Sequence, residues 1–180
     1  MSSESFRNVF ITGMPGSGKT TLGKLLAKKL DLKYVDTDQL IEALTGKKIS
    51  EIFLEHGELF FRNLEKKILK EIVEDKEKKI ISLGGGTPCN EENLNLIKST
   101  GFMIYLQLTP KALTSRISQN PEVRPMFTGM NPDEITDKVS GLLAEREKYY
   151  SKADLIVRGL NADHHELFQK IKSIVHHTSV

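Results

Sequence analysis

One glycine-rich segment, residues 13–20, constrains this chain more than any other feature. Its letters GMPGSGKT fit the spacing G-x-x-x-x-G-K-[ST] at every fixed position. In that pattern the backbone N–H groups face phosphate oxygens, the lysine reaches the terminal phosphates and the last hydroxyl binds Mg²⁺. An apolar run at 8–11 precedes the segment, and leucines at helical spacing follow over 21–30. This strand–loop–helix order favours a phosphate-binding loop over the alternative, a glycine-rich turn that matches by chance.

Composition excludes several classes of protein. A chain of 180 residues is long enough for one domain with a substantial core. Its 26 basic residues nearly balance its 24 acidic ones, unlike a general nucleic-acid binder, and its single cysteine suits a reducing compartment. Residues 1–7 contain no apolar signal core, and no run approaches the roughly 20 apolar residues of a membrane span. We therefore expect a cytoplasmic protein that binds neither nucleic acid nor membrane.

Short apolar runs alternate with helix-forming segments along the whole chain. We expect strands at 8–11, 33–36, 79–83, 102–108 and 155–157. Helix starts are indicated by capping patterns at Asn90, Thr109-Pro110, Asn131-Pro132 and Asp163, and His56-Gly57 indicates a break between two helices. This alternation predicts an α/β fold in three layers, with a mostly parallel sheet between helices on both faces.

Two aspartates, Asp36 and Asp38, follow the second expected strand. Ligands of a parallel α/β sheet lie beyond the carboxyl ends of its strands. If the strand continues through both residues, their side chains point to the same face. One carboxylate could then hold a water of a Mg²⁺ shell, and the other could accept a hydrogen bond from a substrate hydroxyl and take its proton. For Asp38 alone, a helix N-cap is an equal alternative.

Three glycines, Gly84, Gly85 and Gly86, follow the third expected strand. They remove side chains from the strand end, so backbone N–H groups could approach a small ligand closely. The alternative is a loose turn between strand and helix. A run of three glycines loses much conformational entropy on folding, which favours a functional reason.

Four arginines are candidates for anion binding, because a guanidinium can hold a carboxylate or phosphate through two hydrogen bonds. Arg62 lies three residues before Glu65, so the two can pair on one helix face. The others are Arg116, Arg124 and Arg146. Taken singly, each of the four could be an ordinary solvated charge.

The segment 120–131 contains two prolines and a glycine and shows no amphipathic period. Unstructured loops of this length are uncommon in compact domains and are often functional. We expect a mobile lid that excludes water during phosphoryl transfer and carries Arg124 to the phosphates. The alternative is an ordinary surface loop.

In order along the chain, these motifs resemble the shikimate kinase family. The resemblance covers nearly the whole chain and rests on this ordered series: residues 13–20, Asp36-Thr37-Asp38, Ile41-Glu42, Gly57-Glu58 with Phe61-Arg62 and Glu65, Gly84-Gly85-Gly86, Arg124-Pro125, and Arg146 with Tyr149-Tyr150. It implies a single kinase domain over 1–180, with a five-stranded parallel sheet of the P-loop type, substrate-binding helices at about 37–65 and a lid at about 120–131. The implied reaction is ATP- and Mg²⁺-dependent phosphorylation of the shikimate 3-hydroxyl, on the route to chorismate and the aromatic amino acids. The family's default state is a monomer.

The resemblance also implies roles for individual residues. Lys19, Asp38 and Arg124 would take part in the transfer itself. Thr20 would bind Mg²⁺ directly and Asp36 through water. Asp38, Arg62, Arg146 and the three glycines would bind shikimate, with Glu65 orienting Arg62. The ATP-binding set would be Gly16, Ser17, Gly18, Lys19, Thr20, Thr21, Arg116 and Arg124.

Two rival functions stay open on the sequence. One is another small P-loop kinase, for gluconate or a nucleoside monophosphate; paired arginines favour an acceptor with a carboxylate but do not separate shikimate from another hydroxy acid. The second is a nucleotide-binding protein without phosphoryl transfer, against which the presence of Lys19, Asp38 and Arg124 counts. Thr87-Pro88-Cys89, Met126-Phe127 and the threonine at position 20 depart from the family's more usual residues.

Overall fold

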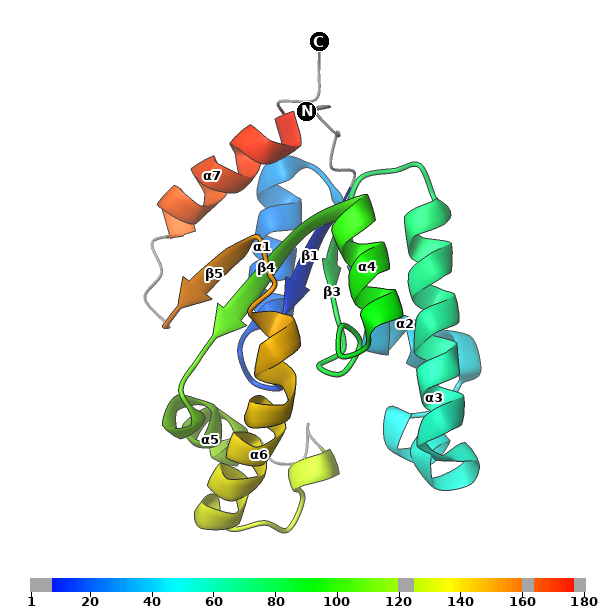
Figure 1. The fold of residues 1–180 in the computed structure, drawn as a ribbon, viewed down its shortest axis with the longest axis vertical. Coiled ribbons are helices and arrows are strands. Elements are labelled where there is room, and N and C mark those ends of the chain that lie inside the picture. The colour runs from blue at the N-terminus through cyan, green and yellow to red at the C-terminus, as the bar shows by residue number, and fades with distance from the viewer. Residues whose placement is uncertain (1–7, 120–124, 160–163, 177–180) are drawn as a thin grey trace.

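The apolar runs of the sequence form one parallel sheet (Figure 1). The computed structural model describes residues 8–119, 125–159 and 164–176. The strands, all paired in parallel, lie in the order β2-β3-β1-β4-β5. Their bounds are β1 Asn8–Thr12, β2 Lys33–Asp36, β3 Lys79–Ser82, β4 Gly101–Gln107 and β5 Leu155–Arg158. The central strand β1 is buried along its whole length, as expected of a parallel sheet with both faces covered.

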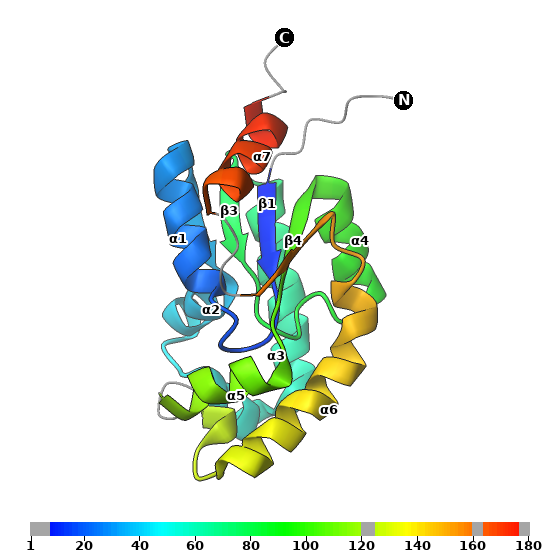
Figure 2. The same cartoon turned by 90° about the vertical axis from the view of Figure 1, so that its left-hand side faces the viewer.

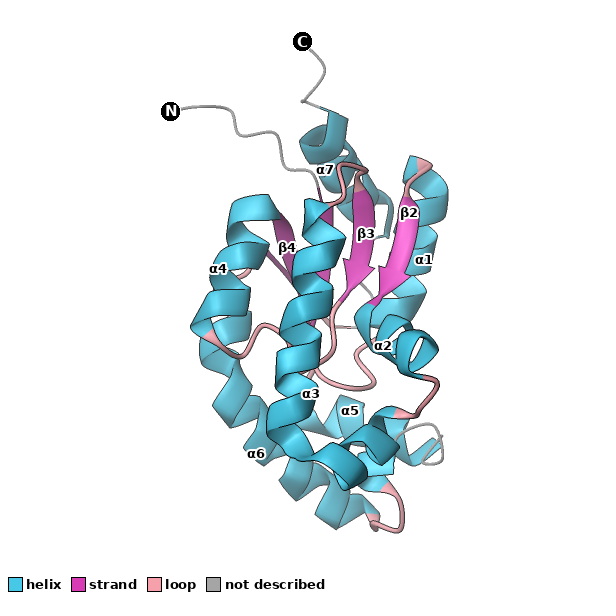
Figure 3. Cartoon of the chain, turned by 90° about the vertical axis from the view of Figure 1, so that its right-hand side faces the viewer, coloured by secondary structure: helices cyan, strands magenta, loops and turns pink. Residues whose placement is uncertain are grey.

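Helices cover both faces of this sheet (Figures 2 and 3). One face packs against α1, Lys19–Leu30, and α7, His164–His176. The other packs against α3, Ile49–Glu74, and α4, Glu91–Thr100. A third apolar cluster, beyond the carboxyl ends of β1 and β4, is formed with α5, Pro110–Gln119, and α6, Pro132–Tyr150. The predicted three-layer α/β fold with a five-stranded parallel sheet is confirmed.

Several local sequence signals have the predicted effect. The Asn90 side chain accepts a hydrogen bond from the Asn93 N–H at the start of α4. Asn131 caps α6, with proline at the next position. The expected break near Gly57 lies inside α3, where Gly57 has φ 77° and ψ 173°. A left-handed φ of this kind is accessible to glycine at little cost, which explains the residue at this position.

The region after β2 differs from the prediction. The strand does not continue through Asp38; α2, Thr37–Thr45, begins directly after Asp36. The helix N-cap is Asp36, whose side chain accepts from the Gln39 N–H, so the N-cap alternative for Asp38 is wrong as well. The two-residue spacing of Asp36 and Asp38 therefore does not place their side chains on one face of a strand. Asp38 instead occupies the first turn of α2, where a carboxylate suits the helix dipole.

Parts of two predictions lie outside the described residues. Of the expected lid at 120–131, residues 120–124 are not described, and Arg124 is among them. The part that follows contains a short 3₁₀ helix, Pro125–Phe127, whose Phe127 is fully buried in the third cluster. The predicted cap Asp163 also lies outside the described residues. Within the described ranges, no helix is both long and apolar enough to cross a membrane.

Substitution by alanine should change the free energy of unfolding in opposite directions at two helical glycines. A Cβ added at Gly23 in α1 would lie 2.5 Å from Cε2 of Tyr34 and 2.9 Å from Oγ of Ser82, whereas one at Gly141 in α6 would meet nothing within 4 Å. We expect Gly23→Ala to lower the free energy of unfolding by about 1–3 kcal/mol through overpacking. Gly141→Ala should raise it by about 0.5–1 kcal/mol through helix propensity. Urea denaturation measures both, and effects of equal sign would contradict the close packing of α1 on β2 and β3.

Candidate active site

The phosphate-binding motif forms the turn between β1 and α1. Gly16 and Gly18 have φ of 85° and 98°, left-handed values that require glycine in practice, and Gly18 is the N-cap of α1. The Lys19 ammonium donates to the carbonyl oxygens of Gly13, at 2.9 Å, and Met14, at 3.1 Å. The N-terminus of a helix and a lysine thus meet at one loop, which is the arrangement that binds phosphate.

Thr20 and Asp36 come together beside this loop. The Thr20 hydroxyl, in the first turn of α1, donates to Oδ2 of Asp36 at 3.1 Å. The Tyr34 hydroxyl donates to the same oxygen at 3.2 Å. A hydroxyl and a carboxylate in contact are oxygen groups of the kind that Mg²⁺ accepts alongside phosphate and water, so these residues fit the predicted metal.

The three glycines after β3 bring the predicted acceptor-binding residues together. A Cβ added at Gly84 would lie 2.5 Å from Oδ1 of Asp38, and one at Gly86 would lie 2.5 Å from Nη1 of Arg62. At Gly85 it would lie 2.8 Å from Nη1 of Arg146. Residues from α2, α3 and α6 therefore converge on one stretch of backbone that has no side chains of its own.

Arg62 is held on α3 by two glutamates. Its Nη1 donates to Oε2 of Glu65 at 2.5 Å, and its Nε and Nη2 donate to Oε1 of Glu58 at 3.2 and 3.1 Å. The Glu65 side chain is 2% exposed and also accepts from the Thr87 hydroxyl at 2.7 Å, whereas Glu58 is 68% exposed. A buried carboxylate with two donors fixes the Arg62 guanidinium on one edge. The other edge, formed by Nε and Nη2, pairs with Glu58, which faces solvent.

Asp38 is a largely buried carboxyl group among other acids. Burial, together with the nearby charges of Glu65 and Asp36, raises the pKa of Asp38 from 3.8 to about 6. Lys19 opposes this by favouring the ionised form. A carboxyl group with its pKa near the working pH is suited to exchange a proton.

The remaining arginines lie at different parts of the site. Nη1 of Arg116, from α5, donates to the Gly16 carbonyl at 3.1 Å, so this side chain reaches the phosphate-binding loop. Nη1 of Arg146, from α6, lies 4.0 Å from the Met14 sulfur, between that loop and the glycines. Arg124 lies outside the described residues.

Comparisons with known proteins identify the same family as the motifs. A family model described as shikimate kinase matches residues 15–176. A shikimate kinase of Azobacteroides pseudotrichonymphae genomovar. CFP2 is 41% identical over 150 residues, which cover 83% of this chain and 88% of the relative. The chain belongs to the shikimate kinase family.

Solved structures of shikimate kinases agree with this membership. The crystal structure of shikimate kinase from Bacteroides thetaiotaomicron aligns with a TM-score of 0.84 at 33% identity, over 93% of this chain and 97% of the other. Shikimate kinase from Acinetobacter baumannii, in complex with shikimate, aligns with a TM-score of 0.82 at 29% identity, over 99% of both chains. The predicted P-loop fold, the ATP-using kinase class and the shikimate kinase function are confirmed.

The sequence did not single out three hydroxyl groups of this shikimate kinase site. Thr37 accepts a hydrogen bond from the Gly84 N–H at 2.8 Å, Thr87 donates to Glu65, and Tyr150 donates to the Gly85 carbonyl at 2.5 Å. Each acts through another residue and belongs to no spacing pattern, so only the folded contacts reveal it. Thr37 and Tyr150 lie within the ordered series of motifs, and position 87 departs from the family's usual small apolar residue, but none of these signals indicated a hydroxyl contact.

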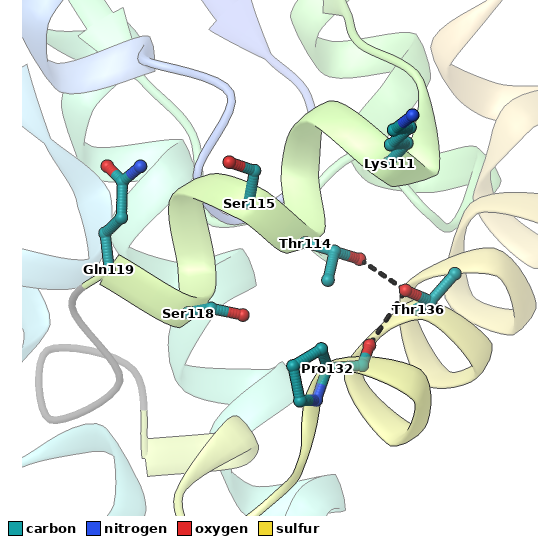
Figure 4. Close-up of a pocket in the computed structure, with 7 residues that line it drawn as sticks. All are labelled: Lys111, Thr114, Ser115, Ser118, Gln119, Pro132 and Thr136. Atoms are coloured by element: carbon teal, nitrogen blue, oxygen red, sulfur yellow. Dashed lines mark hydrogen bonds between the residues drawn. The ribbon is translucent and has the colours of Figure 1, made fainter.

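A hollow of about 630 Å³ between α5 and α6 contains none of the predicted site residues (Figure 4). The Thr114 and Thr136 hydroxyls meet across it at 2.9 Å. Its lining consists of Lys111, Thr114, Ser115, Ser118, Gln119, Pro132 and Thr136. This hollow is therefore separate from the site that the motifs define.

Asp38→Asn should make the protein more stable at high pH. Ionised Asp38 costs folding free energy above its folded pKa of about 6, and the cost disappears as pH falls toward the ordinary value of 3.8. At about 1.4 kcal/mol per pKa unit, we expect the variant to gain roughly 1–3 kcal/mol at pH 8 and to lose this gain between pH 6 and 4. Denaturant unfolding across this range measures it. The exposed Asp137 of α6 provides the control Asp137→Asn, and an equal pH-dependent gain there would contradict the assignment.

Proposed function

We propose that the chain transfers the γ-phosphoryl group of ATP to the 3-hydroxyl of shikimate, with the residues described above in the following roles. The observation that carries this proposal is the convergence of Asp38, Arg62 and Arg146 on the glycines 84–86. A carboxylate for a hydroxyl and two guanidinium groups for a carboxylate match the functional groups of a hydroxy acid. The phosphate-binding loop lies next to this convergence through Met14 and Arg146.

In this proposal Arg62 and Arg146 bind the substrate carboxylate. Glu65 fixes one edge of Arg62, and the exposed Glu58 holds the edge formed by Nε and Nη2. The incoming carboxylate replaces Glu58 on that edge, because a bidentate anion satisfies both donors and Glu58 can turn to water. Gly84, Gly85 and Gly86 form the wall of the acid pocket and leave room for the ring.

Asp38 orients the reacting hydroxyl and accepts its proton. With a pKa of about 6, the carboxyl group is mostly ionised at neutral pH and can act as an acceptor. Lys19, which already opposes protonation of Asp38, lies on the side from which the phosphoryl group arrives. The proton therefore leaves the hydroxyl toward α2 as the oxygen attacks phosphorus.

The ATP phosphates bind to the loop through Gly16, Ser17, Gly18, Lys19, Thr20 and Thr21. Arg116, which contacts the Gly16 carbonyl, and Arg124 on the lid stabilise charge on the transferring group. Thr20, and Asp36 through a water, would hold Mg²⁺, and the ion would supply charge neutralisation at the phosphates. The segment 120–131 closes over the site as a lid and excludes water.

We place the enzyme in the cytoplasm as a single-domain monomer that binds neither nucleic acid nor membrane. Its near-balanced charge, 26 basic against 24 acidic residues, supports the absence of a nucleic-acid partner. The free thiol of Cys89 suits a reducing compartment.

The acceptor can be tested directly with purified protein. We expect Mg·ATP consumption to depend on added shikimate and to be at background with gluconate, AMP or no acceptor. A coupled assay for ADP, with the phosphorylated product identified by mass spectrometry, measures this. Turnover with another acceptor alone would overturn the proposed substrate, and ATP binding without turnover would favour the non-catalytic alternative.

Two variants separate the proposed roles. Asp38→Asn should reduce kcat by at least about a hundredfold while ATP still binds, because the acceptor of the proton is lost. Arg62→Ala should raise KM for shikimate by at least about tenfold with KM for ATP little changed, since a charge-assisted pair is lost. Lys67→Ala removes an exposed cation of the same helix and serves as the control. Near-normal kcat in Asp38→Asn, or an effect of Arg62→Ala on ATP rather than shikimate, would contradict these roles.

A further inference from the structure

Tyr150, the last residue of α6, is fully buried and holds the middle of the glycine run. Its side chain is 0% exposed, and its hydroxyl donates to the Gly85 carbonyl at 2.5 Å. The Cys89 thiol approaches the same carbonyl at 3.6 Å. A carbonyl held in this way fixes the whole peptide plane between Gly85 and Gly86, because the trans peptide is rigid. Backbone hydrogen bonds close the turn around this peptide, from the Thr87 N–H to the Gly84 carbonyl at 3.0 Å and from the Cys89 N–H to the Gly86 carbonyl at 2.9 Å, and Tyr150 adds the side-chain donor to its own oxygen.

The turn of α6 that carries Tyr150 is itself attached to the sheet. Tyr105 of β4 packs against the Tyr150 ring with centroids 5.0 Å apart. The Tyr105 hydroxyl donates to Glu147 at 2.8 Å, and the Gln107 amide donates to the other oxygen of Glu147 at 2.9 Å. Two residues of one strand therefore hold one turn of the helix, through a ring contact and two hydrogen bonds.

Arg146 belongs to the same turn. It lies four residues before Tyr150, and residues at this spacing share a helix face. Its Nη1 is 2.8 Å from the position that a Cβ on Gly85 would occupy, so the arginine fills the space beside the residue whose carbonyl the tyrosine binds. The position of Arg146 relative to the glycine wall is thus set by the contact that Tyr150 makes.

Both phenols are protonated donors at neutral pH. Burial raises the pKa of Tyr105 and of Tyr150 well above the ordinary value of 10. The two hydroxyls therefore act as fixed hydrogen-bond donors in the pH range in which the enzyme works.

We propose that Tyr150 is a positioning residue for the acid substrate: its hydroxyl fixes the Gly85–Gly86 peptide and with it the spacing between the glycine wall and Arg146. The proposal rests on the proposed function, because it takes Arg146 and the glycines as the acid pocket. Tyr150 itself acts through these groups. Its loss should affect the binding of the acid and leave the nucleotide site unchanged.

The test is Tyr150→Phe, which removes one oxygen and keeps the ring. We expect KM for shikimate, and the Kd for shikimate measured by calorimetry, to rise about five- to tenfold, the effect of one lost hydrogen bond. KM for ATP should change by less than twofold, and kcat should fall less than KM rises. The adjacent Tyr149, half-buried with its ring near Lys148 and Lys152, provides the matched control Tyr149→Phe, which should leave all three constants unchanged.

Thermal unfolding of both variants separates positioning from stability alone. A lower Tm with unchanged shikimate affinity in Tyr150→Phe would overturn the proposal, and so would equal losses for shikimate and ATP. If Tyr150→Phe does not fold, Tyr105→Phe removes the hydroxyl that holds Glu147, and the proposal expects the same selective loss of shikimate affinity; unchanged affinity there would overturn it. Wild-type protein that does not phosphorylate shikimate would instead contradict the proposed function.

Discussion

The acid-binding half of the site depends on one buried carboxylate, that of Glu65. A buried charge is tolerated only when hydrogen bonds and an opposite charge compensate it, and here Arg62 and Thr87 supply both. The pairing fixes Arg62 on α3 and Thr87 in the loop after β3, so one side chain joins a helix to the glycine run. Glu65 also raises the pKa of Asp38. The same carboxylate therefore influences both the group that binds the acid and the group that receives the proton.

The ionised Asp38 lowers the stability of the fold at the place where the proposed reaction needs a carboxylate. The charges of Glu65, Asp36 and Glu42 act on the buried Asp38 and raise its pKa, and burial makes this repulsion stronger. A sequence selected for stability alone would replace Asp38 with a neutral residue. The phosphate-binding loop partly offsets the cost, since Lys19 favours the ionised form of Asp38. A bound nucleotide brings its own charges to this balance, so the protonation of Asp38 is coupled to the nucleotide site.

The fold could be predicted largely from the sequence because its signals are local. Apolar runs, caps at Asn90 and Asn131 and the glycine at position 57 each act within a few residues, and each has its expected effect in the structure. The contacts just after β2 could not be predicted this way. Asp36, not Asp38, caps α2, and the neighbouring Thr37 hydroxyl accepts a hydrogen bond from the Gly84 N–H, 47 positions away in the sequence. The contacts of Tyr150 and Thr87 were missed for the same reason: their partners are distant in sequence, and hydroxyl groups follow no spacing rule.

The run of glycines shows how spatial and conformational requirements differ. Gly16 and Gly18 adopt left-handed φ values, so the backbone itself requires glycine at those positions. Gly84, Gly85 and Gly86 do not adopt such values. Their side chains are excluded instead by Asp38, Arg146 and Arg62, each of which would lie within 2.8 Å of an added Cβ. The same residue type thus has two different roles. In the phosphate-binding loop, glycine permits the left-handed backbone. In the run 84–86, its missing side chain leaves room for three side chains from three different helices. The spacing of those side chains then depends on what holds the bare backbone, which is why hydroxyl groups from Thr37 and Tyr150 contact it.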